Sequence, residues 1–334
     1  MDPKIKTLAP QIWAAVEKAD NILLHCHYNP DQDSIGSALA MMDALEGMGK
    51  KVTVIKGDSD LPNFTKYFPG SEKIVLKNYF KLDLAQFDLF IILDSADSKR
   101  ISVVQEVVFP SNLKTVVIDH HSSNLGFGDI NLVVTNYPAT AQILFDLFTE
   151  WKITITPAIA QCLLVAIHSD TGGFKYRNTS SHTFAVAAEL AKIAPDFDQL
   201  LLSIYGSKSL ATVKFIGYIL DTMEVYFAGK VTIGSMDYET TQRLSLTRSD
   251  THNSGVNMML KEIDGVVMSF LLIENQAGKT GISSRSSNGN KYNVMELMKK
   301  FGGGGHTVAA GATVDKPLAE VKQELLNYLT GVVQ

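Results

Sequence analysis

The chain has 334 residues, of which 46% are hydrophobic and 19% are charged, a composition typical of a globular protein long enough for two domains. No apolar run approaches the roughly 20 residues of a membrane span, and residues 1–10 lack the apolar core of a signal peptide. The net charge of −5 provides no global basic field for gripping long duplex nucleic acid, so we expect small or short substrates.

The cysteines predict a reducing compartment. Cys26 and Cys162 have no metal-type spacing and indicate reduced thiols. We therefore expect a cytoplasmic protein that binds no membrane. No residue pattern predicts the oligomeric state, so a homodimer is left open.

The first half of the chain alternates strand-like and helix-like segments. Apolar runs of strand length lie at 22–25, 52–55, 89–93 and 115–118. This alternation predicts an α/β fold with a mostly parallel sheet. The first helix should begin at an N-cap, Asp33 or Ser34, and end at Gly49. Three more helices are predicted at 140–151, 157–168 and 181–194, the last capped by Ser180.

The pattern changes after about residue 226 to a strand-rich unit. Strands are expected at 230–236, 265–275 and 279–286, with a helix at 293–301. We therefore predict a larger α/β domain at 1–191, a helical linker at 192–211 and a smaller α/β domain at 212–334.

Four clusters of acidic and histidine residues follow apolar segments of the larger domain. They are HCHYNPDQD at 25–33, LDSAD at 93–97, DHH at 119–121 and SDTGG at 169–173. Open α/β sheets place ligands at the carboxyl ends of their strands, so the clusters should converge on one edge. Carboxylates and imidazoles without thiolates favour Mn²⁺ or Mg²⁺ over structural zinc. Two such ions bridged by carboxylates hydrolyse phosphate esters, so the sequence predicts a phosphoesterase.

The first two clusters each have a structural alternative. His27, Asp31 and Asp33 have the spacing of a turn that directs an imidazole and two carboxylates to one point, although Asp33 alone would be explained as an N-cap. His25 shares a strand face with His27 and fits a core or supporting histidine. Asp94 closes an apolar strand, where it must be solvated, paired or metal-bound because burying it unpaired costs several kcal/mol.

The other two clusters contribute further candidates. Asp119, His120 and His121 are consecutive and cannot all face one way, so one histidine is expected to bind metal and the other to orient it or meet substrate. Asp119 is available to accept a hydrogen bond from a metal-bound imidazole. Asp170 follows a long apolar helix, and taken alone it would be a solvated carboxylate.

The smaller domain carries a glycine-rich segment, FGGGGH at 301–306. Four consecutive glycines can adopt positive φ and expose successive N–H groups, an anion nest for phosphate, whereas the alternative is a flexible linker. Arg285, at the end of a strand, supplies a guanidinium suited to phosphate, unless it is a plain surface arginine.

Together, HYNPDQDSIGS, LDSAD, DHH, SDTGGF and FGGGGHTVAAGA resemble the DHH phosphoesterase superfamily in the right order over nearly the whole chain. Within it the chain looks like the nano-RNase and pAp phosphatase family, where pAp is 3′-phosphoadenosine 5′-phosphate. The resemblance implies that the larger domain is catalytic and holds two Mn²⁺ ions, replaceable by Mg²⁺ or Co²⁺. It makes the smaller domain the substrate-binding, DHH-associated domain.

The resemblance also implies roles for individual residues. One ion would be bound by His27 and Asp31, the other by Asp33 and His120, and both would be touched by Asp94 and Asp170. The catalytic residues would be His121, as general acid or phosphate contact, and Asp119. The substrate-binding residues would be Arg285, Gly302, Gly303, Gly304, Gly305 and His306.

These observations predict a manganese-dependent phosphoesterase. It would hydrolyse short single-stranded RNA and dinucleotides to nucleoside 5′-monophosphates, and pAp to AMP. The nearest alternative is a cyclic di-AMP or pApA phosphodiesterase of the same fold. A pyrophosphatase fits less well because the GGGGH domain is the wrong partner for it. A nucleotide-binding regulatory module without catalysis disagrees with the complete ligand set.

Overall fold

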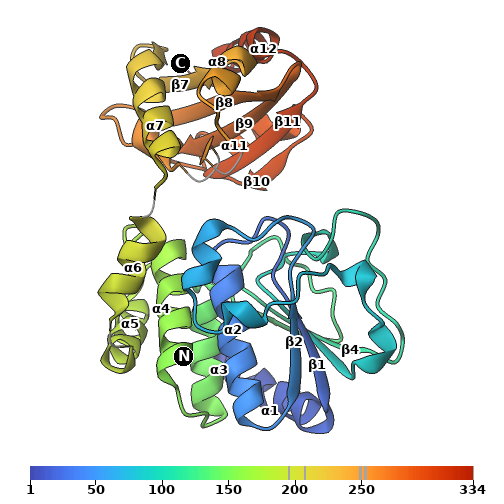
Figure 1. The fold of residues 1–334 in the computed structure, drawn as a ribbon. Coiled ribbons are helices and arrows are strands. Elements are labelled where there is room, and N and C mark those ends of the chain that lie inside the picture. Colours follow the sequence, from blue (N-terminus) through green and yellow to red (C-terminus); the bar gives the residue numbers. More distant parts are fainter. Residues whose placement is uncertain (195, 207, 248–249, 252–253, 334) are drawn as a thin grey trace. The chain divides into compact units, whose positions relative to one another are not determined.

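The computed structural model describes residues 1–194, 196–206, 208–247, 250–251 and 254–333. The chain divides into two compact units, Met1–Ser207 and Lys208–Gln334, each built around its own sheet (Figure 1). The division falls inside the stretch 192–211 where we expected a linker. None of the helices in the described ranges is long and apolar enough to cross a membrane.

The first unit contains a five-stranded parallel sheet in the order β2-β1-β3-β4-β5. The strands are β1 (Asn21–His25), β2 (Lys51–Ile55), β3 (Leu89–Leu93), β4 (Lys114–Asp119) and β5 (Ile130–Val133). The predicted α/β class with a parallel sheet is therefore confirmed. β5 was not predicted, because four residues with one fully buried side chain give almost no periodic signal.

The helices of the first unit are α1 (Pro3–Lys18), α2 (Gln32–Gly47), α3 (Thr140–Glu150), α4 (Pro157–Asp170), α5 (Ser181–Ile193) and α6 (Phe197–Tyr205). Short 3-10 turns follow β2 and β3, namely η1 (Asn63–Tyr67), η2 (Ser71–Lys73), η3 (Tyr79–Lys81), η4 (Leu84–Gln86) and η5 (Ser98–Arg100). Ser180 caps α5 in a capping box with Thr183, as predicted. α6 packs Leu200 and Ile204 into the core of this unit, so part of the expected linker belongs to the first unit.

The N-cap of α2 differs from the prediction of Asp33 or Ser34. The cap is Asp31, whose side chain accepts a hydrogen bond from the N–H of Ser34. Asp33 is instead buried inside the first turn, where its carboxylate accepts bonds from the start of α3, 107 and 108 positions away. A partner that distant in the chain leaves no local sequence signal.

The two faces of the first sheet bury separate apolar layers. One face packs Leu24, Ile91 and Val116 against α2, α3 and α4, and the other packs Phe90 and Val117 into an aromatic-rich cluster. α2 and α4 lie so close that a Cβ at Gly36 would be 2.6 Å from the Cys162 carbonyl oxygen. This close contact holds the start of α2 and the end of α4, two segments that carry candidate site residues, in fixed positions.

The second unit has a six-stranded mixed sheet in the order β10-β11-β9-β8-β7-β6. Its strands are β6 (Glu224–Tyr226), β7 (Val231–Met236), β8 (Met268–Gln276), β9 (Lys279–Ser286), β10 (Gly304–His306) and β11 (Ala309–Val314). Its helices are α7 (Leu210–Thr222), α8 (Tyr238–Arg243), α10 (Val256–Lys261), α11 (Val294–Lys299) and α12 (Leu318–Thr330). The predicted strands β7, β8 and β9 and the helix α11 are present, whereas β6, β10, β11 and α12 were not predicted.

Candidate metal centre

Adjacent strands bring the acidic and histidine clusters to one edge of the first sheet. β1, β3 and β4 are neighbours, and their carboxyl ends lead into His27, Asp94 and Asp119. α2 begins at the same edge, and α4 ends there with Asp170. The carboxyl edge of a parallel sheet is where α/β proteins bind ligands. Four separate segments of the chain therefore bring their polar side chains together in one cluster at this edge.

Three overlapping groups of side chains have ligand atoms that lie within 4.8 Å of one another and could hold a metal ion. The groups are His27, Asp31 and Asp94; Asp33, His120 and Asp170; and Asp94, His120 and His121. All six predicted metal ligands fall in these groups. Asp94 and His120 each belong to two of them.

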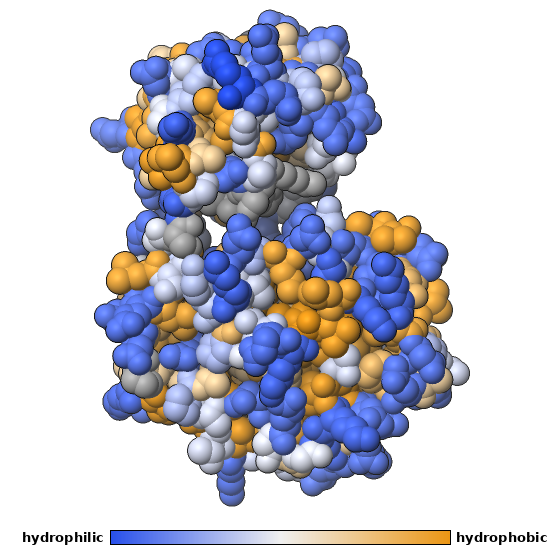
Figure 2. All heavy atoms as spheres, viewed as in Figure 1, coloured by the Kyte–Doolittle hydropathy of each residue, from blue (hydrophilic) through white to orange (hydrophobic). Residues whose placement is uncertain are grey.

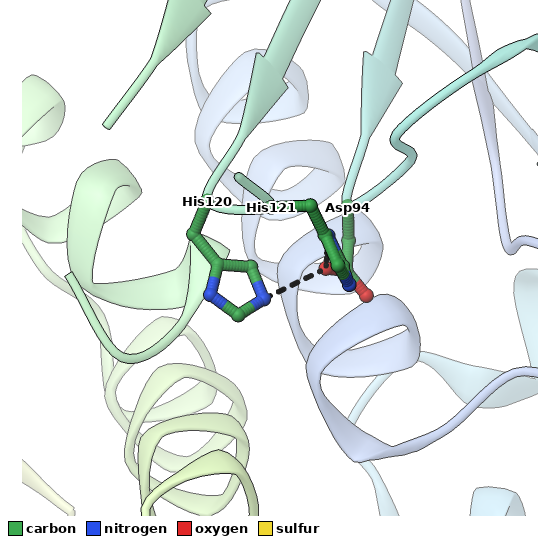
Figure 3. Close-up of side chains that lie close together, drawn as sticks. All are labelled: Asp94, His120 and His121. Carbon is green, nitrogen blue, oxygen red and sulfur yellow. Dashed lines mark ion pairs between the residues drawn. The ribbon is translucent and has the colours of Figure 1, made fainter. Parts of the chain in front are cut away.

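An imidazole nitrogen of His120 points toward the carboxylate of Asp94, and His121 lies beside that carboxylate (Figure 3). Oδ2 of Asp94 is 3.3 Å from Nε2 of His27, and its Oδ1 is 3.5 Å from Nε2 of His120. Nε2 of His120 is also 3.5 Å from Oδ2 of Asp170, and Nε2 of His27 is 3.8 Å from Oδ1 of Asp31. Atoms that each bind one ion at about 2.1 Å are separated by roughly 3 to 4 Å. The spacing therefore fits shared ions.

The backbone of Asp94 is strained. Its φ is +51°, in the left-handed region that non-glycine residues rarely adopt. Its N–H continues the sheet by donating to Ile118. Such strain costs on the order of 1 to 3 kcal/mol and is found mainly at functional sites. The turn aims the carboxylate along the sheet edge toward both histidines.

Asp33 is held by hydrogen bonds from two helices. Its carboxylate accepts from the N–H groups of Thr140 at 2.7 Å and Ala141 at 3.0 Å, and from the Ser37 hydroxyl at 3.1 Å. These donors lie at the first turn of α3 and in α2. Asp33 therefore has a fixed orientation as a candidate ligand.

The electrostatics of the cluster indicate a need for cations. Burial, then the charge of Asp94, raises the pKa of Asp33 to about 7, and burial together with Asp33 raises the pKa of Asp170 well above its usual range. Burial alone would lower the pKa of His120, but the Asp94 carboxylate outweighs it and raises that pKa to about 10. Protons thus supply the positive charge that these carboxylates need.

His120 provides a direct test of fit for a metal. Its Nε2 is buried and has no hydrogen-bond partner among the described residues. An unsatisfied buried polar atom costs about 1 to 3 kcal/mol. A divalent ion between the two carboxylates would bind this nitrogen and replace the bound protons. The donor set of imidazole nitrogen and carboxylate oxygen suits Mn²⁺ or Mg²⁺.

His121 and Asp119 form a separate hydrogen-bonded pair beside the cluster. Nδ1 of His121 lies 2.7 Å from Oδ1 of Asp119, and the Asn124 amide donates to Oδ2 of Asp119 at 2.8 Å. Burial lowers the pKa of His121, but Asp119 and Asp94 outweigh it and raise that pKa above its usual value. Asp119 thus orients His121 and favours its charged form.

Two further residues extend the site. His25 is buried against the edge of Phe90, at 5.5 Å between ring centroids, and burial followed by the charge of His27 lowers its pKa to about 3. It is therefore a neutral core histidine.

Arg100 also lies at the site, and the sequence did not predict it. Its Nη2 lies 2.8 Å from Nε2 and 3.0 Å from Nδ1 of His27.

Arg100 lies over the face of the His27 ring. One nitrogen nearly equidistant from both ring nitrogens must lie above the imidazole plane, because Cε1 occupies the in-plane position between them. The Nδ1 of His27 is also 2.9 Å from the carbonyl of Tyr28, which leaves Nε2 with its lone pair facing the carboxylates. The sequence signal was the pair Lys99 and Arg100 shortly after the LDSAD segment.

The structure places the remaining predicted residues in the second unit. Arg285, half-buried on β9, donates to the carbonyl of Ser284 at 2.8 Å and has a long contact of 3.4 Å to Ser283. His306 ends the edge strand β10, which pairs with β11.

The expectation of four consecutive exposed N–H groups in the GGGGH segment is wrong for its first half. The N–H groups of Gly302 and Gly303 donate to the carbonyls of Lys299 and Met298 and thereby terminate α11. The positive φ of Gly302 allows this helix ending. Gly304 lies in β10, and no atom lies within 4 Å of a Cβ built there.

Known proteins share both units. Residues 21–167 match the family model described as DHH family, N-terminal domain, and residues 244–334 match the DHHA1 domain. The chain belongs to the DHH family of phosphoesterases, which confirms the resemblance. It is 29% identical, over 95% of its length and 94% of the relative's, to the bifunctional oligoribonuclease and PAP phosphatase NrnA of Thermus thermophilus.

The chain is also similar to a solved structure and to a relative with a different named activity. A crystal structure of an exopolyphosphatase-related protein from Bacteroides fragilis matches with a TM-score of 0.88, at 26% identity over 98% of each chain. The cyclic-di-AMP phosphodiesterase PdeA of Listeria monocytogenes is 25% identical over 98% of this chain but only 50% of its own length. The fold is therefore shared by relatives with different named activities.

Proposed function

We propose that the chain is a manganese-dependent phosphodiesterase and phosphatase. Its substrates are short oligoribonucleotides and dinucleotides, cleaved to nucleoside 5′-monophosphates, and pAp, converted to AMP. The observation that carries the proposal is the sharing of Asp94 and His120 between candidate ligand groups. A shared carboxylate is the arrangement that two-metal phosphoesterases use to hold a pair of ions.

The six ligands divide between two ions. His27 and Asp31 would hold one, Asp33 and His120 would hold the other, and Asp94 and Asp170 would contribute carboxylates to the pair. When bound, Mn²⁺ supplies Lewis acidity that activates water and neutralises charge on the phosphate. The distances from Asp94 to both histidines support this division.

His121 and Asp119 handle a proton. Because Nδ1 of His121 is committed to Asp119, its Nε2 is the atom that meets substrate. Burial lowers the pKa of His121, but Asp119 and Asp94 outweigh it and raise that pKa, which favours the protonated ring. We propose that Nε2 donates it to the leaving oxygen. Asp119 holds the ring in the required orientation.

The second unit contributes phosphate binding. We propose that Arg285, His306 and the glycines at 302–305 bind the far phosphate of the substrate. The guanidinium of Arg285 offers a planar pair of donors suited to phosphate. Gly302 and Gly303 act by shaping the loop, since their N–H groups serve α11. Substrate length is then limited by the requirement to reach both groups.

The alternative function, hydrolysis of cyclic di-AMP or pApA, stays a candidate because one relative with that name matches nearly the whole chain. The oligoribonuclease and pAp phosphatase function is favoured because the relative with that name matches over nearly its own full length as well. The cytoplasmic location and a homodimer stay predictions.

One assay tests the proposal. Purified protein stripped of metal and reloaded with Mn²⁺, Mg²⁺ or Co²⁺ is given pAp, pApA, cyclic di-AMP and RNA of 2 to about 20 nucleotides. We expect Mn²⁺-dependent release of nucleoside 5′-monophosphates, with a rate that falls steeply as RNA lengthens. Equal rates on 2-mers and 20-mers, or a preference for cyclic di-AMP over every linear substrate, would contradict it.

A further inference from the structure

A polar cavity of about 460 Å³ lies where α4 ends in the first unit. It is lined by Gln32, Ser169, Lys175, His168 and Tyr205, together with the glycines of the turn at 172–173. Both glycines of this turn have positive φ, which folds the backbone back against the end of α4.

A second, apolar cavity of about 590 Å³ adjoins the first on the surface of α6. Leu201 and Leu202 line it, and His168 and Tyr205 line both cavities. Leu202 is 68% exposed and Tyr205 is 39% exposed, which is unusual for large apolar side chains that lie side by side. Figure 2 shows hydrophobic side chains exposed over the region that α6 occupies in Figure 1.

The polar cavity begins next to the metal centre. Ser169 directly precedes Asp170, and Gln32 stands between the candidate ligands Asp31 and Asp33. The hydroxyl of Ser169 donates to Oε1 of Gln32 at 3.0 Å, which ties the two segments together at the cavity wall. A ligand whose phosphate lies at the metal centre therefore meets this cavity with its next chemical group.

The shared wall is aromatic and rigid. The rings of His168 and Tyr205 are 5.2 Å apart, and Phe174 and Phe197 flank His168 at 5.8 and 6.5 Å. Nδ1 of His168 is buried and, in the described part of the chain, has no hydrogen-bond partner. A flat heteroaromatic ring that stacks on Tyr205 would cover the exposed apolar surface.

We propose that the two cavities form a nucleoside site, in which the ribose of a nucleoside 5′-phosphate lies in the polar cavity and its base stacks on Tyr205 over Leu202. The inference rests on the proposed phosphoesterase function, because it takes the phosphate of the same nucleotide to lie at the metal centre. Stacking tolerates any base, since every base has a π-face. The site therefore recognises a nucleoside without selecting its sequence.

The test compares two ligands that differ only in the base. Calorimetry on the full Mn²⁺-loaded chain measures the Kd of AMP and of ribose 5-phosphate. Loss of a base–aromatic stack weakens binding by about five- to a hundredfold, so wild type should bind AMP more tightly by that factor. Tyr205→Ala should lower the AMP affinity to that of ribose 5-phosphate, and Tyr205→Phe should retain the difference.

A second variant of the site and one control outside it complete the test. Leu202→Asp changes a side chain that is 68% exposed, so it leaves the fold intact and should weaken AMP binding alone. Tyr238→Ala removes a tyrosine of similar exposure, 36%, in the second unit and should change neither Kd. Equal affinity of wild type for the two ligands, or a full AMP advantage in Tyr205→Ala, would overturn the nucleoside site.

The same variants separate this inference from the proposed function. If pAp, pApA and short RNA are not hydrolysed but the AMP advantage is still lost in Tyr205→Ala, the substrate assignment is wrong and the nucleoside site stands. If those substrates are hydrolysed and Tyr205→Ala leaves the AMP advantage unchanged, the function stands and the nucleoside site is wrong.

Discussion

The carboxylate of Asp119 is bound on both sides, by Nδ1 of His121 at 2.7 Å and by the amide of Asn124 at 2.8 Å. It is fully buried and lies one residue before His120 in the chain. A carboxylate so placed orients His121 without needing to bind metal itself. This distinction gives the first prediction.

Asp119→Asn should lower kcat by about tenfold to a hundredfold while the amount of bound Mn²⁺ is unchanged. Replacing a residue that orients a site residue through a hydrogen bond typically lowers activity by about that factor. The amide no longer stabilises the charged form of His121, so the limb of the pH–rate profile that reports a protonated acid should move to lower pH. Steady-state kinetics between pH 5 and 10 with metal analysis checks this. A loss of bound Mn²⁺ equal to the loss of activity would show that Asp119 is itself a ligand.

Asp94→Asn should abolish turnover and remove bound metal. The substitution keeps the size of the side chain but removes the charge that two ligand groups share. Asp60→Asn, at a fully exposed carboxylate, is the matched control and should behave like wild type. Metal content after dialysis and turnover of pApA under saturating Mn²⁺ are measured together. More than a tenth of wild-type activity in Asp94→Asn would contradict the shared-carboxylate centre.

We expect the guanidinium of Arg100, beside His27, to donate to the substrate phosphate, so Arg100→Ala should lower kcat/KM for dinucleotides by about tenfold to a hundredfold, the cost of losing that charge-assisted hydrogen bond. Removing a cation beside His27 and Asp94 should at the same time tighten Mn²⁺ binding, which calorimetry measures. Arg100→Lys keeps the charge but not the flat guanidinium over the ring, so it should restore only part of the activity. The exposed neighbour variant Lys99→Ala should leave both quantities unchanged. Weaker Mn²⁺ binding in Arg100→Ala would mean that the guanidinium supports the ligands instead.

The sequence predicted which residues lie at the site better than it predicted the residues that contact them. The apolar strands and the polar residues at their ends have local signals, so Asp94 and the DHH segment were located correctly at the sheet edge. Asp33 was predicted as a metal ligand, but it was also offered as the helix cap because the donors that bury it, Thr140 and Ala141, belong to another helix. Arg100 was missed because its contact with His27 spans 73 positions.

The glycine-rich segment shows the opposite error. Its composition suggested free N–H groups, but the chain uses Gly302 and Gly303 to end α11 and Gly305 to approach β11 closely. Composition alone does not tell which backbone groups of a glycine run are already bonded. Only the geometry of α11 and β11 resolves this.

The stability of the metal-free protein should fall as pH rises from about 6.5 to 10, the range above the ordinary pKa of His25, whose lowered pKa of about 3 makes stability rise with pH only below that range. The pKa of Asp33 is 3.8 in the unfolded chain and about 7 when folded, raised by burial and then by Asp94, so its contribution is lost as pH rises through 7. The pKa of His120 rises from 6.5 in the unfolded chain to about 10 when folded, because the charge of Asp94 outweighs burial. Its contribution to the free energy of unfolding is therefore lost as pH rises from 6.5 through 10. Saturating Mn²⁺ should reverse the trend, with a larger gain in Tm at pH 9 than at pH 6.5. Thermal unfolding with and without Mn²⁺ measures it, and a metal-free Tm that rises across this range would contradict the assigned pKa directions.

Adjacent glycines of the GGGGH segment should respond differently to the same substitution. A Cβ at Gly303 would be 2.1 Å from the carbonyl oxygen of Gly311, so Gly303→Ala should destabilise the second unit by about 1 to 3 kcal/mol or more. A Cβ at Gly304 meets nothing within 4 Å, so Gly304→Ala should change stability by no more than about 0.5 kcal/mol. If Gly304 is glycine because substrate approaches its backbone, Gly304→Ala should nevertheless lower kcat/KM on pApA by about tenfold. Gly217→Ala, at another open position of the same unit, is the control for kcat/KM; because Gly217 lies inside α7, this substitution should raise stability by about 1 kcal/mol. A stable Gly304→Ala variant with wild-type kcat/KM on pApA would show that substrate does not approach the loop there, because no fold requirement explains glycine at that position.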